Sequence, residues 1–368
     1  MTPEWAEAFV DDVLEWSFMG FDDLEEVAEL RAAIEYFDDP VQTISYADFV
    51  AAWNRPGAHA SHHAVVGRER SGSIVAYGWN HPGLPTDANP SVWFDIGVHP
   101  AWRHQGIRHR LTMWLIGRAQ QWWEHIRTAQ TGALWVGTTV DEKRGGLTRS
   151  MIEAGLTPQR WFFDMHRPLE AGDSLPPLPK LTDVSIVPFD DSLSELVRQA
   201  HNEAMATRPG SSPVSAQAWE SSINNHPENS QLSWVALVNR DTPAHEGAAH
   251  GRVVGYAMNL AYDDETSEGW TERLGVCPWC RKKGIGRALV IASMRGFADA
   301  GLTSAGVGVD TEDPNTAARF FGVLGFEETE RVVVYGRTFR VEQPDSPALS
   351  PAGRHGRGGS CRGAAGHR

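Results

Sequence analysis

A block of fourteen residues occurs twice in this chain, and this repeat restricts the possible folds more than any other feature. The segment 95–108 (DIGVHPAWRHQGIR) aligns without gaps with the segment 273–286 (RLGVCPWCRKKGIG). The identical pairs are Gly97/Gly275, Val98/Val276, Pro100/Pro278, Arg103/Arg281, Gly106/Gly284 and Ile107/Ile285. An internal repeat of this kind indicates that one structural unit is present twice.

Segments of the same predicted type flank both copies. In each copy a strand-like run comes first (92–98 and 273–276), a helix-like run follows (111–126 and 288–300), and a short strand comes next (133–140 and 306–309). The second copy is also preceded by a strand (184–188) and a helical stretch (192–206). We therefore predict an α/β (α+β) fold with two tandem units, each a mixed, mostly antiparallel sheet flanked by helices, with the sheets side by side.

Composition suggests where these units begin and end. A stretch rich in Pro and small polar residues, EAGDSLPPLPKL, starts at Glu170 and is typical of an extended linker. The end of the chain from Pro344 is rich in Gly, Arg, Ser and Pro and holds little apolar surface. The predicted divisions are a first unit at 1–169, a linker at 170–182, a second unit at 183–343 and a disordered tail at 344–368.

Charge and cysteine content exclude some classes of partner. The net charge of −14 argues against nucleic acid and against an anionic membrane surface. No apolar run approaches the roughly 18 residues of a membrane helix, and the acidic start does not resemble a signal peptide. Three cysteines provide no disulfide framework, which favours a cytoplasmic location. An acidic surface suits a cationic small-molecule amine, although it also serves solubility, and the oligomeric state is not determined.

The segment 276–287 carries the strongest chemical signal. A strand ends, a basic turn containing Gly284 and Gly286 follows, and a helix begins at about Arg287. This order brings backbone N–H groups and the positive end of a helix dipole to one point, which suits a phosphate. Glycines let the backbone approach such a group closely. The alternative is a tight turn with a solvated basic face.

Two motifs in this half resemble those of the GNAT superfamily of N-acetyltransferases. The pattern Arg281-x-x-Gly284-x-Gly286 is similar to the family's acyl-CoA pyrophosphate loop. The segment 313–326 (DPNTAARFFGVLGF) is similar to its second signature, an Asn-led helix that ends in Leu-Gly-Phe. The resemblance covers 184–340 well and 22–169 weakly, and the duplicated architecture is similar to that of mycothiol synthases.

The resemblance implies an acyl-CoA site in the second half, with acetyl-CoA as co-substrate and no metal. The strand ending at Val276 is expected to splay from the strand 306–309, and the pantetheine arm to lie in the opening. An amine would attack the thioester directly in a ternary complex, while a backbone N–H stabilises the oxyanion. The implied cofactor-binding residues are Leu274, Gly275, Val276, Arg281, Lys282, Lys283, Gly284, Ile285, Gly286, Arg287, Asn315 and Phe321.

Two positions depart from the family pattern. Phe321 stands where many relatives have a proton-donating Tyr, and Trp270 stands where many have a Glu. Glu272 lies two residues further on, hence on the same strand face, and is the candidate base. Asp310 and Glu268 are reserves. These departures also motivate an alternative function, a catalytically weakened acyl-CoA-binding sensor or regulatory module.

The remaining signals are weaker. In the first half Arg108 replaces the second loop glycine and Met151 takes the Tyr position, so we predict a degenerate unit that binds no CoA. Cys277 and Cys280 form a lone CxxC whose basic neighbours should lower the thiol pKa. His59, His62 and His63 are more typical of a solvated loop than of a metal site. Trp122 and Trp123 are expected in the core, and His201 and Asn202 are expected to pack or cap.

Overall fold

One continuous sheet runs through both halves of the chain in the computed structural model. The model describes residues 9–340 except 10, 41–42, 56–59, 129, 170–174, 208–210, 225–230, 239–250 and 263–266. Within these residues twelve strands pair in the order β1-β2-β3-β4-β5-β12-β6-β11-β10-β9-β8-β7. The predicted mixed α/β class is confirmed. The two sheets do not merely lie side by side, however, because their strands join into one sheet.

The two halves have the same element order. The first comprises β1 (Glu15–Phe18), α1 (Leu24–Asp38), α2 (Tyr46–Trp53), β2 (Ala64–Arg68), β3 (Ile74–Pro82), β4 (Ser91–Val98), α3 (Ile107–Ile126), β5 (Leu134–Asp141), α4 (Gly145–Glu153) and β6 (Thr157–Pro168). The second comprises β7 (Val184–Pro188), α5 (Ser194–Met205), α6 (Ala216–Asn224), β8 (Trp234–Val238), β9 (Val253–Tyr262), β10 (Glu268–Val276), α7 (Ile285–Asp299), β11 (Ser304–Thr311), α8 (Pro314–Gly322) and β12 (Glu327–Phe339). The predicted repeat of one unit is therefore present in three dimensions.

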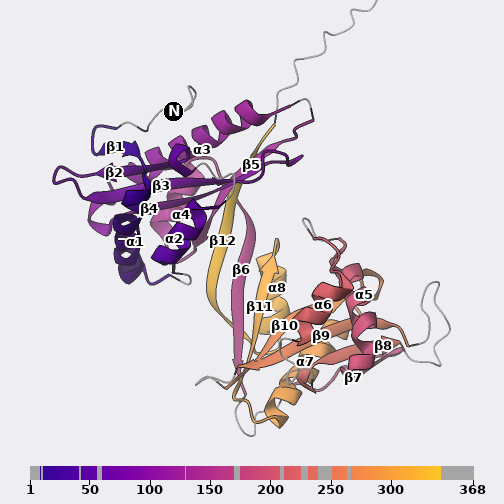
Figure 1. The fold of residues 1–368 in the computed structure, drawn as a ribbon. Helices are drawn as coiled ribbons and strands as arrows, with labels where there is room; N and C mark the ends of the chain where they lie inside the picture. The colour runs from indigo at the N-terminus through magenta and orange to yellow at the C-terminus, as the bar shows by residue number, and fades with distance from the viewer. Residues whose placement is uncertain are drawn as a thin grey trace, which may run out of the picture.

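The last strand of each half pairs with the other half. β6 runs antiparallel to β11, from Ser304 opposite Pro168 to Thr311 opposite Trp161. β12 likewise runs antiparallel to β5, with Phe339 opposite Leu134. The two exchanged strands also pair with each other, and they run together between the two lobes of the molecule (Figure 1). Each lobe is thus completed by a strand from the other half.

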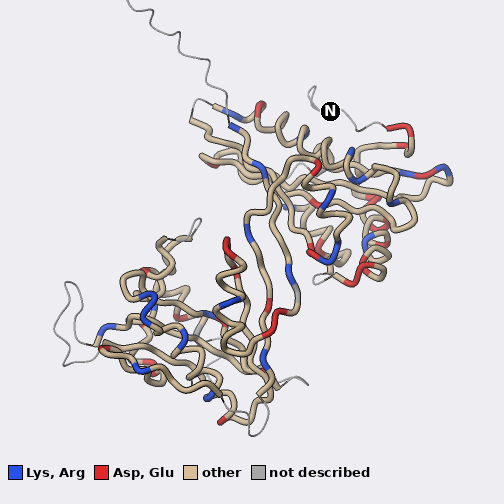
Figure 2. Tube along the Cα trace, turned by 180° about the vertical axis from the view of Figure 1, so that it is seen from behind, with Lys and Arg blue, Asp and Glu red and all other residues tan. Residues whose placement is uncertain are grey.

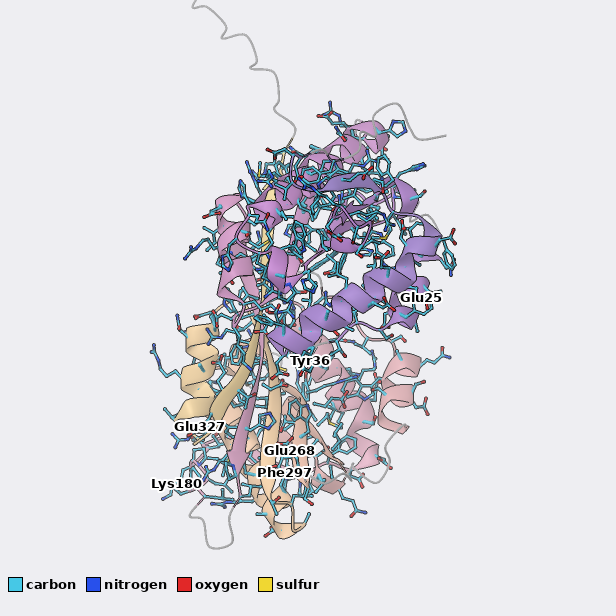
Figure 3. All side chains as sticks on the ribbon, turned by 90° about the vertical axis from the view of Figure 1, so that its left-hand side faces the viewer. Glu25, Tyr36, Lys180, Glu268, Phe297 and Glu327 are labelled. Atoms are coloured by element: carbon cyan, nitrogen blue, oxygen red, sulfur yellow. The ribbon has the colours of Figure 1, made fainter. Side chains whose placement is uncertain are left out.

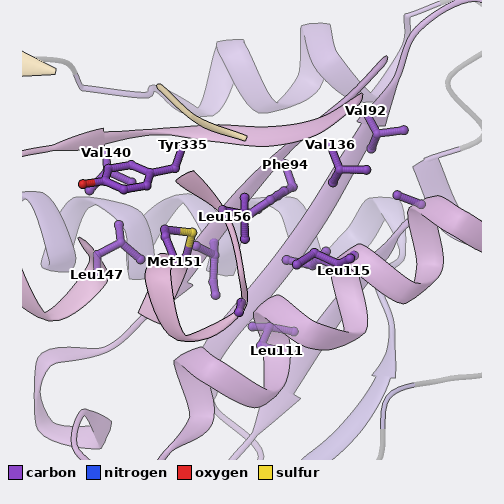
Figure 4. Packing of buried hydrophobic residues seen from close by; sticks show 14 of the residues in the cluster. Val92, Phe94, Leu111, Leu115, Val136, Val140, Leu147, Met151, Leu156 and Tyr335 are labelled. Carbon is purple, nitrogen blue, oxygen red and sulfur yellow. The ribbon is translucent and has the colours of Figure 1, made fainter. Parts of the chain in front are cut away.

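The exchange extends to the hydrophobic core. Tyr335 of β12 packs among buried residues of the first half, including Val140 and Met151 (Figure 4). At the opposite end of the same strand, Glu327 lies on the second lobe with Glu268 and Phe297 (Figure 3). Charged residues of both signs are interspersed along β6 and β12 where these strands pass between the lobes (Figure 2). Apolar packing therefore anchors β12 in the first lobe, while the segment between the lobes carries charge.

Helices cover both faces of the sheet in each lobe. In the first lobe α1 and α2 pack on one face with Tyr77 and Trp79, and α3 and α4 pack on the other with Phe94. Strands buried on both faces read as continuous apolar runs, which explains β2 and most of β3. Trp122 and Trp123 of α3 are buried, as predicted. Among the described residues, no helix is long and apolar enough to cross a membrane.

Candidate functional site: an open strand edge beside a helix start

β10 and β11 separate halfway along their length. They pair in parallel only from Glu268 to Thr271, which lies opposite Val307. A bulge follows, because Thr271 faces Asn259 of β9 and Arg273 faces Met258, so that Glu272 has no partner. Beyond the bulge β10 stays with β9 while β11 stays with β6. The opening predicted beside Val276 is confirmed, and it exposes one edge of β10.

The loop after β10 turns its backbone toward this opening. Lys282 and Gly284 have positive φ angles of 62° and 82°, and Gly284 caps α7, which begins at Ile285. The first turn of a helix has N–H groups without partners in the helix, so this end of α7 is suited to an anion. Arg281 has a role that the sequence did not reveal. It donates hydrogen bonds to the carbonyls of Val276 (3.0 Å) and Ala204 (2.8 Å), which tie the loop to β10 and α5.

A cavity of about 840 Å³ lies between the open edge, this loop and the end of β11. Nine of the predicted cofactor-binding residues line it: Leu274, Gly275, Val276, Arg281, Lys282, Gly284, Ile285, Gly286 and Arg287. Lys283 and Asn315 are exposed and are not part of the lining. Phe320 lines the cavity instead of its neighbour Phe321. Asp313 also lines it and caps α8 by accepting a hydrogen bond from the Thr316 N–H (3.1 Å).

A second cavity, of about 590 Å³, adjoins the first. The two share Arg160, Met205, Leu274 and Asp310 in their linings. The second is also bordered by His201, Thr271, Glu272, Arg273 and Phe321. A long substrate in the first cavity would therefore end beside a second, separate compartment. This arrangement suits a reaction between two molecules.

Glu272 lines the second cavity but differs from its predicted setting. The bulge interrupts the strand alternation that placed Glu272 on the face of Trp270. Its side chain is 49% exposed and lies 3.6 Å from Nε of Arg273. Of the two reserves, Asp310 is bound by Arg160, whereas Glu268 contacts His166 Nδ1 (2.7 Å) and lines neither cavity.

His201 joins the second cavity, which the sequence had not favoured. Its Nδ1 lies 2.7 Å from the hydroxyl of Tyr256, and its ring packs against Trp219. Burial, and next the nearby Arg273, lower the pKa of His201. A neutral imidazole can accept a proton at neutral pH, so His201 is a second candidate base. Asn202 does stabilise the local structure as predicted, through hydrogen bonds with both backbone groups of Val214 (3.1 and 2.8 Å).

Comparisons with known proteins agree with this geometry. A family model described as an acetyltransferase (GNAT) domain matches residues 229–328, which include β10, the loop, α7, β11 and α8. The second half contains a GNAT domain. No curated protein gives a match.

Solved structures share the fold over most of the chain. A GCN5-related N-acetyltransferase from Sphaerobacter thermophilus superposes with a TM-score of 0.59 at 21% identity, covering 90% of this chain and 98% of that chain. A GCN5-related glucosamine N-acetyltransferase region of a fungal multi-domain β-N-acetylglucosaminidase gives 0.50 at 14% identity, covering 90% and 39%. A tandem GNAT protein from the clavulanic acid biosynthesis pathway gives 0.47 at 16% identity, covering 88% and 98%. The similarity to mycothiol synthases stays a prediction.

The GNAT domain lacks a tyrosine at the end of its second signature, as the sequence indicated. Phe321 is buried in the core beside Phe326, with ring centroids 5.6 Å apart, and reaches the edge of the second cavity. A phenyl ring has no proton to donate. Any proton for the leaving thiolate must therefore come from another group or from water.

The first half repeats the loop of the GNAT domain but fills it differently. His104 and Gly106 have positive φ angles of 69° and 75°, like Lys282 and Gly284. Arg103 donates to both carboxylate oxygens of Asp38 (2.7 and 2.9 Å). Arg108 stands where the GNAT domain has Gly286, and burial, followed by the nearby Arg103, lowers its pKa to about 10. Protein side chains thus occupy the region that is open in the second half.

The cysteines of the GNAT domain are buried free thiols. Burial raises the pKa of Cys277 to about 12 and also raises the pKa of Cys280. The expectation that basic neighbours lower these values is wrong, because desolvation of the thiolate is the largest effect. His59 and Cys361 lie outside the described residues. The same holds for residues 170–174 at the start of the predicted linker and for the whole predicted tail.

Proposed function

We propose that this chain is an N-acyltransferase that moves an acetyl or short acyl group from acyl-CoA to a primary amine of a small molecule. The observation that carries the proposal is the free edge of β10 beside the start of α7, in a GNAT domain, at the junction of two cavities. Acyl transfer from acyl-CoA is the chemistry of the GNAT family. The amine acceptor is supported by the second cavity and by the acidic net charge of −14.

The reaction needs three contributions from the protein. The start of α7 binds the pyrophosphate, and backbone N–H groups on the edge of Leu274 to Val276 stabilise the oxyanion that forms on the thioester carbonyl. The acceptor nitrogen then bonds to the carbonyl carbon while the C–S bond breaks. Holding amine and thioester together contributes about 7 kcal/mol or more to rate enhancement when orientation is good.

Two protons move during this transfer. An alkylammonium with a pKa near 10 must lose one proton before attack, and Glu272 is the candidate base, with His201 as the alternative. The nitrogen loses a second proton after attack, and one proton finally converts the CoA thiolate into the thiol. Atoms and charges balance without a metal or a redox partner.

A catalytically weakened acyl-CoA sensor is the second candidate function. Phe321 in the core and the exposed setting of Glu272 favour it. Thiol release from acetyl-CoA with a panel of primary amines separates the two functions. Release above the hydrolysis rate, with matching acetylated product by mass spectrometry, supports the enzyme. Tight CoA binding without product from any amine supports the sensor. A cytoplasmic location and the absence of nucleic-acid or membrane partners stay predictions.

A further inference from the structure

The side chain of Arg273 is held in place but makes no hydrogen bond to any described residue. Its guanidinium lies over the Trp219 ring, 5.3 Å from the centroid. Its nearest carboxylate oxygen, on Glu272, is 3.6 Å from Nε, which is too long for a hydrogen bond. The side chain is only 28% exposed, and it borders the second cavity. Five N–H donors on a positioned, half-buried cation are thus available to a ligand in that cavity.

In the first half, the residue equivalent to Arg273 forms an ion pair within the protein. Asp95 aligns with Arg273 in the repeat, and Arg31 is the eighth residue of α1 as His201 is the eighth of α5. Asp95 accepts hydrogen bonds from Arg31 (3.2 Å) and from the hydroxyl of Tyr77 (2.5 Å). Cation and carboxylate therefore satisfy each other there without a ligand.

The GNAT domain differs at both members of this pair. Arg273 stands in place of the carboxylate, and the helix position holds His201, whose lowered pKa favours the neutral form. Tyr256 keeps the role of Tyr77 and contacts the helix residue. The helix thus provides no carboxylate to Arg273, and the cavity lies where one could enter.

We propose that Arg273 binds a carboxylate of the acceptor, so that the acceptor is an amino acid or a similar small molecule carrying both an amine and a carboxylate. This inference rests on the proposed function. A planar guanidinium pairs with a carboxylate through two parallel hydrogen bonds. Arg273 borders only the second cavity, and not the one lined by the CoA loop, which favours the acceptor over the acyl group as the source. A bound carboxylate would also draw Arg273 away from Glu272.

The first test compares acceptors that differ only in the carboxylate. Thiol release from acetyl-CoA is measured with phenylalanine against phenethylamine, and with lysine against cadaverine. We expect kcat/KM to favour the amino acids by about tenfold to a hundredfold, the value of a charged hydrogen-bonded pair. Equal rates within each pair, or a preference for the decarboxylated amines, would overturn the inference and leave the proposed function intact.

The second test changes Arg273. In Arg273→Gln the KM for phenylalanine should rise by at least tenfold with a smaller change in kcat, and the loss of kcat/KM with phenethylamine should be at least tenfold smaller than the loss with phenylalanine. Arg273→Lys should recover only part of the loss, because it keeps the charge without the planar fork. Arg149→Gln, which removes an exposed cation from α4, is the matched control. An equal loss with both acceptors would mean that Arg273 has only a structural role.

Two further arms identify the source of the carboxylate and separate the hypotheses. With succinyl-CoA and phenethylamine, a selective loss in Arg273→Gln would assign the carboxylate to the acyl group and overturn the acceptor assignment. Binding of N-acetylphenylalanine and of N-phenethylacetamide is measured by calorimetry with CoA present. If no amine releases thiol, the proposed enzyme fails, and this binding still decides the inference. Arg273-dependent preference for N-acetylphenylalanine supports the inference, and equal binding of the two overturns it.

Discussion

The guanidinium of Arg160, on β6 of the first half, hydrogen-bonds both carboxylate oxygens of Asp310, on β11 of the second half, with Nη2 to Oδ2 at 2.7 Å. Both residues border both cavities, and hydrogen bonding to Asp310 raises the pKa of Arg160. A residue of the first half therefore forms part of the site in the GNAT domain.

Replacement of Arg160 by Met should impair acyl transfer without unfolding the protein. The change removes the positive charge that offsets Asp310 beside the first cavity, so that the carboxylate should repel the phosphates of CoA more strongly. We expect kcat/KM for acetyl-CoA to fall about tenfold or more, as for loss of one charged interaction. Arg337→Met, at an exposed position of β12, is the control. Unchanged kinetics for Arg160→Met would assign the ion pair a purely structural role.

CoA should bind at one site per chain. Calorimetry is expected to give a stoichiometry of one, because Arg108 and the Arg103–Asp38 pair occupy the corresponding region of the first half. Gly286→Arg should weaken binding at least a hundredfold by filling the cavity with a side chain. Gly322→Arg adds the same side chain at an exposed position with open space and should bind as the wild type does. Two equivalent sites would contradict this model.

The pH dependence of the rate distinguishes the two candidate bases. If Glu272 is the base, Glu272→Gln lowers the rate by about 10² near pH 7, and the rate recovers as pH rises and free amine accumulates. If His201 is the base, its lowered pKa keeps it neutral above its usual value of 6.5. The acidic limb of the wild-type profile then lies below pH 6.5, and His201→Gln, rather than Glu272→Gln, loses the rate near pH 7 and recovers it as free amine accumulates. Tyr256→Phe, which removes only the hydroxyl partner, controls for the packing of His201.

The second half should not fold alone. A fragment of residues 170–368 lacks β6, and so β11 loses its neighbour along eight paired residues. We expect aggregation and no cooperative melting, because an unpaired strand edge promotes association. Co-expression with residues 1–169 should restore a soluble complex that binds CoA. A monomeric, CoA-binding fragment 170–368 would show that the exchange is dispensable.

The buried thiols should resist modification. In a Cys361→Ser variant at pH 8, Cys277 should react with a disulfide reagent about a thousandfold more slowly than an unperturbed cysteine, because its pKa of about 12 leaves little thiolate. Unfolding in urea should expose it to reaction at the ordinary rate. Fast reaction in the native state would show that the thiol is accessible.

Local features of the site could be predicted from the sequence. The loop with Gly284 and the start of α7 depend on neighbours in the chain, and the repeat supplied an independent copy of the pattern. The strand exchange could not be predicted, because β6 and β12 have the same pattern whichever half they pair with. The bulge at Glu272 was also hidden, since it leaves no mark on the alternation of residue types. Arg273 was passed over because its role becomes apparent only by comparison with Asp95, the aligned residue of the first half, which pairs with Arg31.

The exchanged strands have a consequence for the order of synthesis. β5 leaves the ribosome long before Val332, the first residue of β12 that pairs with it. At about 5–20 residues per second, the intervening stretch of roughly 200 residues takes about ten to forty seconds to make. For that time the nascent first lobe has an open edge and lacks Tyr335 in its core. The lobe that is made first is therefore completed only after β12 has been made, and the edge of β5 is open to association until then.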